Sequence, residues 1–318
     1  MILAEEERIL SINKTKDVSL TVFYQTSYLL FKIYKMSKKL ILSFLICFSS
    51  LYSWAGKVVT DSIYSTVLGS TVLYNVYLPD GFETEGRKFP VVYLLHGLSN
   101  TYRTWNDRSH MKEIADELIE SGEATPMVII MPNAGHPDVH HQWNGFFDMP
   151  GWKYETFFFS EFLPAVEQKY RIIGDKQHRA IMGLSMGGGA STVYCQKHPE
   201  MFSSSYAMSA WLTCDKPKEG KNGKDKLYLV TQSVNENSTI DFLANADKAT
   251  IEKLRTVRWF YDCGDDDPDM GLSVNMHVLS MYNGIKDELR IRNGGHNWEY
   301  WNSALRLALP FASQDFRK

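Results

Sequence analysis

The chain has few cysteines and no apolar run long enough to span a membrane. Only four of its 318 residues are cysteines. Three of them follow residue 55, an odd number that cannot pair completely, and they lack the spacing of a zinc site: Cys195, Cys214 and Cys263. The longest apolar segment, 40–51, is shorter than the ~20 residues that cross a bilayer. The sequence therefore predicts neither a disulfide framework nor stable membrane insertion.

The chain also has no large excess of either positive or negative charge. The formal net charge is −3, from 34 basic and 37 acidic residues. The one strongly basic stretch, 216–226, is rich in glycine and lysine, which is typical of a solvated loop. Nucleic acid is therefore not an expected partner. With 44% hydrophobic residues and no internal repeat, the chain can bury one large core.

The first 55 residues differ from the rest. A short basic region begins at Met36, the apolar segment 40–51 follows, and Ser53-Trp54-Ala55 is a cleavage sequence before Gly56. Residues 36–55 are predicted to be a signal peptide, so we expect export to the periplasm or the outside. Residues 1–35 are then a mis-assigned start or a disordered extension, and 56–318 form the folded domain.

Short apolar runs alternate with helical stretches through this domain. This alternation predicts an α/β fold: a mainly parallel twisted sheet with helices on both faces. A longer insertion, at about 211–254, separates two of the core strands. Strands are expected at 72–78, 89–95, 127–131, 179–184, 203–208, 256–262 and 287–292.

The segment Gly183-Leu184-Ser185-Met186-Gly187 lies between a predicted strand and a predicted helix. In a G-x-S-x-G turn the flanking residues must lack bulk, and the serine Oγ is raised toward a substrate. A plain structural turn is the alternative. We predict that Ser185 is a nucleophile.

A serine nucleophile needs a base and an acid that orients the base. His296 follows two glycines on a predicted strand-to-helix loop, and an acidic cluster lies between Ser185 and His296. This order, serine then acid then histidine, is typical of α/β-hydrolases. Residue chemistry alone does not choose among the acids, which are Asp262, Asp265, Asp266, Asp267 and Asp269.

An oxyanion site is predicted at the loop that follows strand 89–95. The loop begins His96-Gly97-Leu98, and the N–H of Leu98 can point toward the nucleophile beside the N–H of Met186. We interpret His96 as a structural residue that packs this loop.

The chain resembles the esterase D and carbohydrate esterase family 1 branch of the α/β-hydrolases over about residues 65–315. The resemblance rests on His96-Gly97, residues 183–188, Asp262-Cys263-Gly264 through Asp267, and residues 294–298. It implies a single-domain α/β-hydrolase fold and a serine esterase. The acid of that family stands three residues after the glycine, which implies Asp267, with Asp266 as runner-up. Pro268-Asp269 follows, where the family usually has bulky apolar residues.

The branch includes feruloyl esterases, acetylxylan esterases, S-formylglutathione hydrolases and mycolyltransferases. Tryptophans gather on loops near the predicted site, and flat rings suit an aromatic acyl group or a sugar. The predicted substrate-binding residues are Trp105, Trp143, Trp211 and Trp298. We therefore favour a secreted feruloyl esterase that acts on feruloylated or acetylated plant cell-wall polysaccharide or its fragments.

Other functions stay open at this point. Acetylxylan esterase is the nearest alternative, followed by a thioesterase like S-formylglutathione hydrolase, against which the export signal argues, or an acyltransferase. A non-catalytic carbohydrate-binding relative is a further class. The oligomeric state is not predicted.

A histidine-rich loop contains His136, His140 and His141. Pro137 argues against one helical face for these imidazoles, and no second carboxylate accompanies them. Neither a metal nor a cofactor is predicted.

Overall fold

The computed structural model describes residues 25, 27–32, 34–35, 55–135, 144–219 and 225–317. The chain divides into two compact units, Met1–Trp54 and Ala55–Lys318. In the first, the described residues are helical and exposed. None of the described helices combines the length and the apolar character that a membrane span requires. The predicted signal peptide lies outside the described residues, apart from Ala55.

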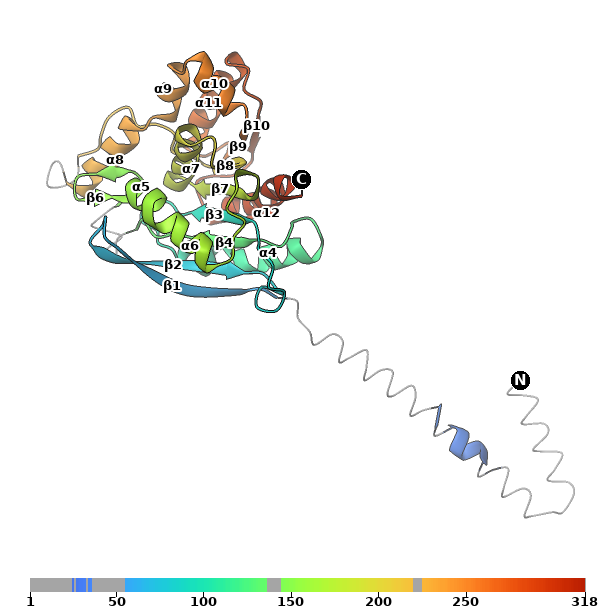
Figure 1. Ribbon diagram of the computed structural model, residues 1–318. Helices are drawn as coiled ribbons and strands as arrows, with labels where there is room; N and C mark the ends of the chain where they lie inside the picture. The colour runs from blue at the N-terminus through green and yellow to red at the C-terminus, as the bar shows by residue number, and fades with distance from the viewer. Residues whose placement is uncertain are drawn as a thin grey trace, which may run out of the picture. The chain divides into compact units, whose positions relative to one another are not determined.

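The second unit is built on one eight-stranded sheet, with the order β1-β2-β4-β3-β7-β8-β9-β10 (Figure 1). The pairs β1/β2 and β2/β4 are antiparallel, and all the other neighbours are parallel. A two-stranded hairpin, β5/β6, lies apart from the sheet. The strands are β1 Lys57–Ser65, β2 Ser70–Leu78, β3 Val91–Leu95, β4 Val128–Met131, β5 Asp148–Met149, β6 Trp152–Lys153, β7 Arg179–Leu184, β8 Ser204–Met208, β9 Arg258–Gly264 and β10 Asp287–Arg292.

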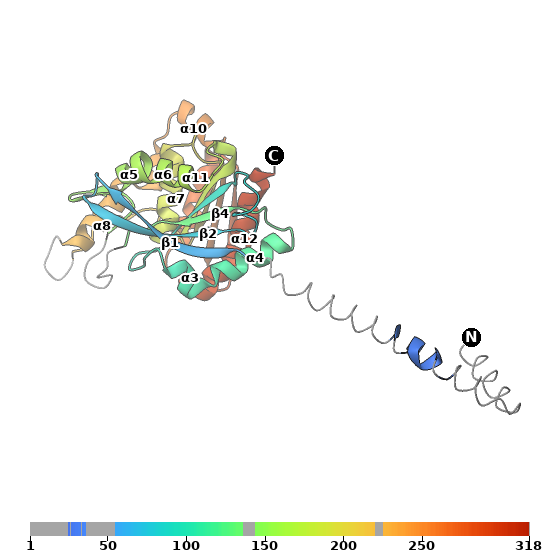
Figure 2. The same cartoon turned by 60° about the horizontal axis from the view of Figure 1, so that its bottom comes forward.

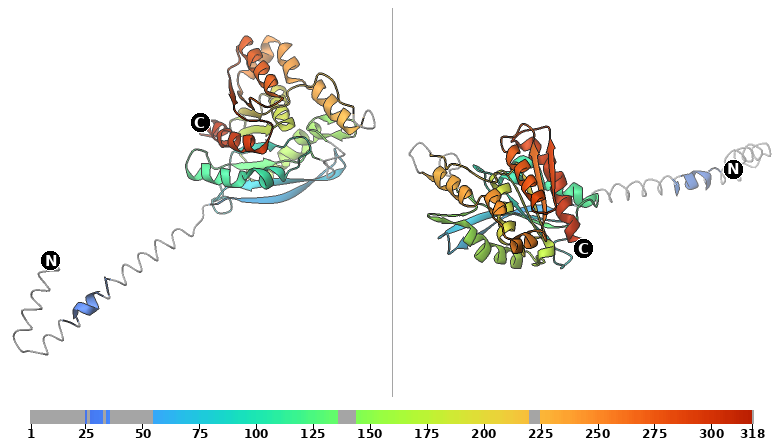
Figure 3. Two further views of the ribbon diagram at one scale, coloured as in Figure 1. Left: turned by 180° about the vertical axis from the view of Figure 1, so that it is seen from behind. Right: turned by 90° about the horizontal axis from the view of Figure 1, so that it is seen from above.

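Helices cover both faces of this sheet. Figure 2 and Figure 3 show α3, α4 and α12 on one face and α5, α6, α7 and α11 on the other. Between β8 and β9 the predicted insertion forms α8, α9 and α10. The helices are α3 Thr104–Ser109, α4 Met111–Glu120, α5 Tyr154–Phe157, η1 Phe158–Phe162, α6 Leu163–Lys169, η2 Lys176–His178, α7 Met186–Lys197, α8 Lys226–Glu236, α9 Thr239–Ala244, α10 Lys248–Leu254, α11 Met270–Tyr282 and α12 Trp298–Phe316.

The central strands are buried on both faces, which explains the continuous apolar sequence of β3. In β3, Val91 and Tyr93 belong to the core under α7, whereas Val92 and Leu94 belong to the core under α12. The α4 residues Met111, Ile114, Ala115 and Leu118 follow helical spacing and pack into the latter core. The predicted α/β fold with a mainly parallel sheet is confirmed.

All seven predicted strands are present, but β1 and the β5/β6 hairpin were not predicted. β1 lies at an edge of the sheet, and most of its side chains are exposed or half-buried. An edge strand with polar residues lacks the apolar run on which the prediction of the other strands depended.

Candidate active site

Ser185 occupies a sharp turn between the end of β7 and the start of α7. Its backbone has φ 52° and ψ −118°, a left-handed φ that residues with a side chain rarely adopt. A Cβ on Gly183 would lie 2.6 Å from the carbonyl oxygen of Gly187, and one on Gly187 would lie 2.6 Å from that of His96. The turn therefore excludes side chains at both glycines, as the sequence predicted.

His296 lies on the loop between β10 and α12, and its imidazole faces Ser185. The distance from His296 Nε2 to Ser185 Oγ is 3.0 Å. The loop passes close to the end of β9: Gly294 has φ 143°, and a Cβ on Gly264 would lie 2.0 Å from the Gly294 carbonyl oxygen. The Asn297 side chain caps α12 by accepting the N–H of Tyr300 at 3.0 Å. These contacts hold the histidine loop over Ser185.

Asp267 is the carboxylate that meets His296. Both of its oxygens lie 3.0 Å from His296 Nδ1, and its side chain is buried. The runner-up, Asp266, is exposed, and its backbone N–H donates to the Gly294 carbonyl oxygen at 3.0 Å. Asp265 accepts the Gly294 N–H, also at 3.0 Å. Asp265 and Asp266 therefore brace the histidine loop, and Asp267 contacts the imidazole.

Asp267 and His296 each stabilise the charged form of the other. Burial alone would raise the pKa of Asp267, but hydrogen bonds from His296 and from the Asp269 N–H hold that pKa below its usual value. Burial would lower the pKa of His296, but the hydrogen bond and charge of Asp267, together with the charge of Asp269, raise it. Since only a neutral imidazole can accept a proton, His296 loses the ability to act as a base as pH falls through this raised pKa.

The two predicted oxyanion donors are the N–H groups of Met186, which follows Ser185 in the chain, and of Leu98. Met186 is the first residue of α7, so its N–H is one of the amides that cannot bond within the helix. Leu98 lines the same cavity as Ser185. The buried ring of His96 accepts the Ala134 N–H at 3.0 Å and donates to the Gly97 carbonyl oxygen at 2.8 Å. Burial lowers the pKa of His96 to about 4, so this neutral ring anchors the loop.

A cavity of about 440 Å³ opens beside Ser185 and His296. Its aromatic wall consists of Trp298 and Trp301, whose rings meet edge to face at 5.1 Å. Trp301 also meets the His296 ring at 5.0 Å, and the Arg108 guanidinium lies 5.7 Å from the Trp298 ring centre. The lining residues are Gly97, Leu98, Asn100, Arg108, Leu184, Ser185, His296, Asn297, Trp298 and Trp301.

The four predicted substrate-binding tryptophans have different positions. Trp298 lines the cavity. Trp105 is fully buried and donates its Nε1–H to the Leu95 carbonyl oxygen at 3.1 Å, so its prediction was wrong. Trp211 is half-buried, and its backbone N–H donates to the Ser185 carbonyl oxygen at 3.0 Å, but it does not line this cavity. Trp143 lies outside the described residues.

Sequence reasoning missed three polar residues of the cavity, Asn100, Arg108 and Asn297. Arg108 stands on the last turn of α3, three residues after buried Trp105, and no local pattern distinguishes it from other surface arginines. The spacing of Trp298 and Trp301, by contrast, places both rings on one helical face. That spacing was the available signal for the aromatic wall.

Asp262 has a structural role beneath the site. It is fully buried and accepts hydrogen bonds from Tyr206 OH and Tyr300 OH, both at 2.6 Å, and from Arg290 Nε at 3.0 Å. A buried carboxylate needs such hydrogen-bond donors to replace the water it has lost. These bonds tie β8, β9, β10 and α12 together at the point where the acid and histidine loops emerge.

Among the described residues, the potential metal ligands that lie together are Asp267, Asp269 and His296, with donor atoms within 4.8 Å of one another. Two of these residues already bond to each other, and His296 Nε2 faces Ser185. The predicted histidine-rich loop at 136–141 lies outside the described residues. The absence of a metal and of a cofactor from the reaction remains a prediction.

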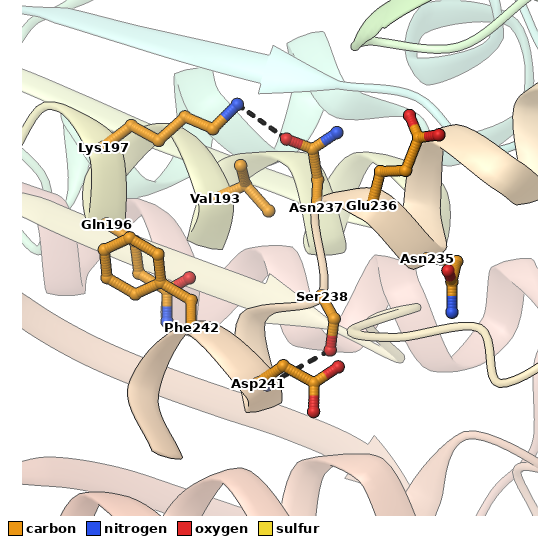
Figure 4. Close-up of a pocket in the computed structure, with 9 residues that line it drawn as sticks. All are labelled: Val193, Gln196, Lys197, Asn235, Glu236, Asn237, Ser238, Asp241 and Phe242. Atoms are coloured by element: carbon orange, nitrogen blue, oxygen red, sulfur yellow. Dashed lines mark hydrogen bonds between the residues drawn. The ribbon is translucent and has the colours of Figure 1, made fainter. Parts of the chain in front are cut away.

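A second cavity, of about 280 Å³, lies among α7, α8 and α9 and is distinct from the site at Ser185 (Figure 4). Several of its polar groups bond within it: Lys197 Nζ donates to Asn237 Oδ1 at 2.6 Å, and the Asp241 N–H donates to Ser238 Oγ at 3.2 Å. Its lining residues are Val193, Gln196, Lys197, Asn235, Glu236, Asn237, Ser238, Asp241 and Phe242. This lining contains no histidine that could activate its serine.

The fold and the site define a class of protein. A mainly parallel sheet, a serine on a strained strand-to-helix turn, and a histidine and a carboxylate on later loops are together typical of the serine hydrolases of the α/β-hydrolase fold. The family model described as "Putative esterase" matches residues 65–312. The chain belongs to this esterase family and is an esterase.

Similar proteins agree with this class. A solved structure of a ferulic acid esterase is 48% identical, with a TM-score of 0.79, over 83% of this chain and 100% of that one. Esterase Rv1288 of Mycobacterium tuberculosis is 34% identical over 42% of this chain and 28% of its own length. An endo-1,4-β-xylanase/feruloyl esterase of Xylanibacter ruminicola is 28% identical over 46% and 20%. The match thus spans less than a third of these two curated relatives.

Proposed function

We propose that this esterase hydrolyses feruloyl esters of plant cell-wall polysaccharide or its fragments, with Ser185, His296 and Asp267 as its catalytic triad. The observation that carries the proposal is the pair of hydrogen bonds through His296, from Ser185 on one side to Asp267 on the other. The ferulic acid esterase that is 48% identical to the chain supports the choice of acyl group.

The proposed reaction proceeds in two halves. Ser185 Oγ attacks the ester carbonyl carbon while His296 Nε2 takes the hydroxyl proton, and the N–H groups of Leu98 and Met186 stabilise the oxyanion. His296 then returns the proton to the departing sugar alcohol, which leaves an acyl-enzyme. Water, activated by His296, attacks this intermediate and releases ferulate.

The aromatic wall suits the feruloyl ring better than an acetyl group. An acetyl group gains little from a flat aromatic surface, whereas a phenyl ring stacked on or set edge to face with Trp298 buries area on both. Acetylxylan esterase activity is the second candidate, because the triad acts on any ester that reaches it.

A comparison of three substrates tests the proposed function. The chain from Gly56 onward is assayed with methyl ferulate, acetylated xylan and S-formylglutathione. We expect the highest kcat/KM for methyl ferulate. Preferential release of acetate would favour the second candidate, and turnover of the thioester alone would contradict both wall-esterase functions.

Shortening Trp298 tests the aromatic wall. Trp298→Ala is expected to raise KM for methyl ferulate by about fivefold or more, because an aromatic pair contributes about 1 kcal/mol beyond its buried area. The KM for 4-nitrophenyl acetate should change little, since acetate does not need the ring. Equal losses on both esters would mean that Trp298 only supports the histidine loop.

Export is also part of the proposal. A basic start at Met36, the apolar segment 40–51 and the small residue Ala55 support a signal peptide that is removed before Gly56. Expression from Met36 in a secreting host should yield an exported protein whose amino-terminal residue is Gly56. Retention of an uncleaved protein in the cell would contradict export.

A further inference from the structure

A second carboxylate lies beside the triad. Asp269 Oδ2 is 4.0 Å from His296 Nδ1, the same ring nitrogen that Asp267 contacts. The Asp269 N–H donates to Asp267 Oδ1 at 2.9 Å, so the two acids share one short turn at the start of α11. The Asp269 side chain is 23% exposed, which leaves it only partly screened by water.

We propose that Asp269 is a positioning residue that acts on His296 through its charge, so that the acidic limit of the reaction is set by two carboxylates rather than one. The inference rests on the proposed role of His296 as the base. Asp269 is separate from the groups that meet the substrate, because among the described hydrogen bonds it contacts neither Ser185 nor the oxyanion donors.

The surroundings of Asp269 bring the pKa of its carboxyl group into the range in which a histidine titrates. The groups that face it are Asp267, His296 and Lys218 from the segment that precedes α8, with the thiol of Cys263 on β9 nearby. Burial raises the pKa of Asp269 to about 6 and Asp267 adds to the rise, although His296 and Lys218 oppose it. Asp269 is therefore charged at neutral pH and loses its charge in mildly acidic solution.

This arrangement predicts a particular pH profile. An ionised Asp269 stabilises the imidazolium, which raises the pKa of His296 and moves the loss of activity to higher pH. A proton on Asp269 removes this attraction and makes the second proton, on His296, harder to add. The two protonation steps are thus anticooperative. The acidic limb of the pH–activity profile, where activity falls as pH is lowered, should therefore be broader than the limb that a single titrating group gives.

The test replaces Asp269 by neutral residues that can still begin a helix. Asp269→Asn and Asp269→Ser both retain an N-cap residue, and the backbone carbonyl that accepts the Leu272 N–H at 3.1 Å is unchanged. Asp266→Asn is the matched control, because it removes the same charge from an exposed side chain of the same loop. The kcat/KM for 4-nitrophenyl acetate is measured from pH 4.5 to 9.

We expect the acidic limb of both Asp269 variants to move to lower pH and to narrow to a single-proton curve. Their activity at pH 5.5, relative to that at pH 8, should rise about threefold or more over wild type. Asp266→Asn should follow the wild-type curve. If the acidic limbs of the Asp269→Asn and Asp269→Ser profiles coincide with that of wild type, the inference is overturned.

The failure of the proposed function is distinguishable from the failure of this inference. An enzyme that hydrolyses 4-nitrophenyl acetate but not methyl ferulate has another natural substrate, and the pH profiles still decide the role of Asp269. If no ester is hydrolysed, NMR titration of the His296 ring decides it instead. Its midpoint should fall in Asp269→Asn and stay unchanged in Asp266→Asn.

Discussion

Ser185→Ala is expected to lower kcat for methyl ferulate and 4-nitrophenyl acetate by about 10⁶-fold, because the oxyanion donors and the cavity cannot replace the lost nucleophile. The substitution removes only the Oγ that faces His296 Nε2 at 3.0 Å. The fold should persist, since the left-handed backbone at this position is held by the glycines and by the Ser185 N–H, which donates to the Met208 carbonyl oxygen at 2.9 Å. Steady-state kinetics and circular dichroism check both statements.

Ser191→Ala is the matched control for this variant. Ser191 is a buried serine within α7, and its Oγ donates to the Gly188 carbonyl oxygen at 2.8 Å rather than to a histidine. It should retain most of the wild-type kcat. If Ser185→Ala kept more than a few per cent of the activity, another residue would be the nucleophile and the proposed mechanism would be wrong.

Asp267→Asn is expected to lower kcat by about 10⁴-fold with little change in the fold. An ionised Asp267 accepts the proton on His296 Nδ1, which leaves Nε2 free to accept the proton of Ser185. An asparagine amide can instead donate to Nδ1, and the ring then carries its proton on Nε2 and cannot act as a base. The measurement is kcat with 4-nitrophenyl acetate at pH 8, where an acid shift of the profile has no effect.

Asp266→Asn distinguishes the two acids that the sequence left in competition. Its side chain is exposed and its contact with the histidine loop uses the backbone N–H, which asparagine keeps. Its kcat should stay within about twofold of wild type, as is usual for a surface substitution. A large loss in Asp266→Asn together with near-normal activity in Asp267→Asn would reverse the assignment.

Much of the fold could be predicted because most of the buried strands are recognisable as apolar runs in the sequence. Most positions of a parallel strand that is covered on both faces are apolar, so β3 and residues 180–184 of β7 form continuous apolar runs. The edge strand β1 has no such run, because eight of its nine side chains are exposed or half-buried. Trp105 was misplaced for a related reason: a tryptophan near a catalytic loop has the same sequence signature whether its ring is buried or lines a cavity.

The sequence by itself determined the class of chemistry. A Cβ on Gly183 would meet the backbone of Gly187, four residues away, and one on Gly187 would meet the backbone of His96 on the adjacent loop. The G-x-S-x-G pattern therefore predicted the tight turn at Ser185, and the order of Ser185 and His296 along the chain follows from the fold. Residue chemistry alone did not choose among the acids: the family resemblance implied Asp267, with Asp266 as runner-up, and the tertiary structure brings Asp267 to His296. Five acids within eight residues differ in which way each side chain points, and this depends on contacts with β10 and the histidine loop from far along the chain. The same distant packing brings Asp269 within 4.0 Å of His296, which no pattern in the sequence indicates.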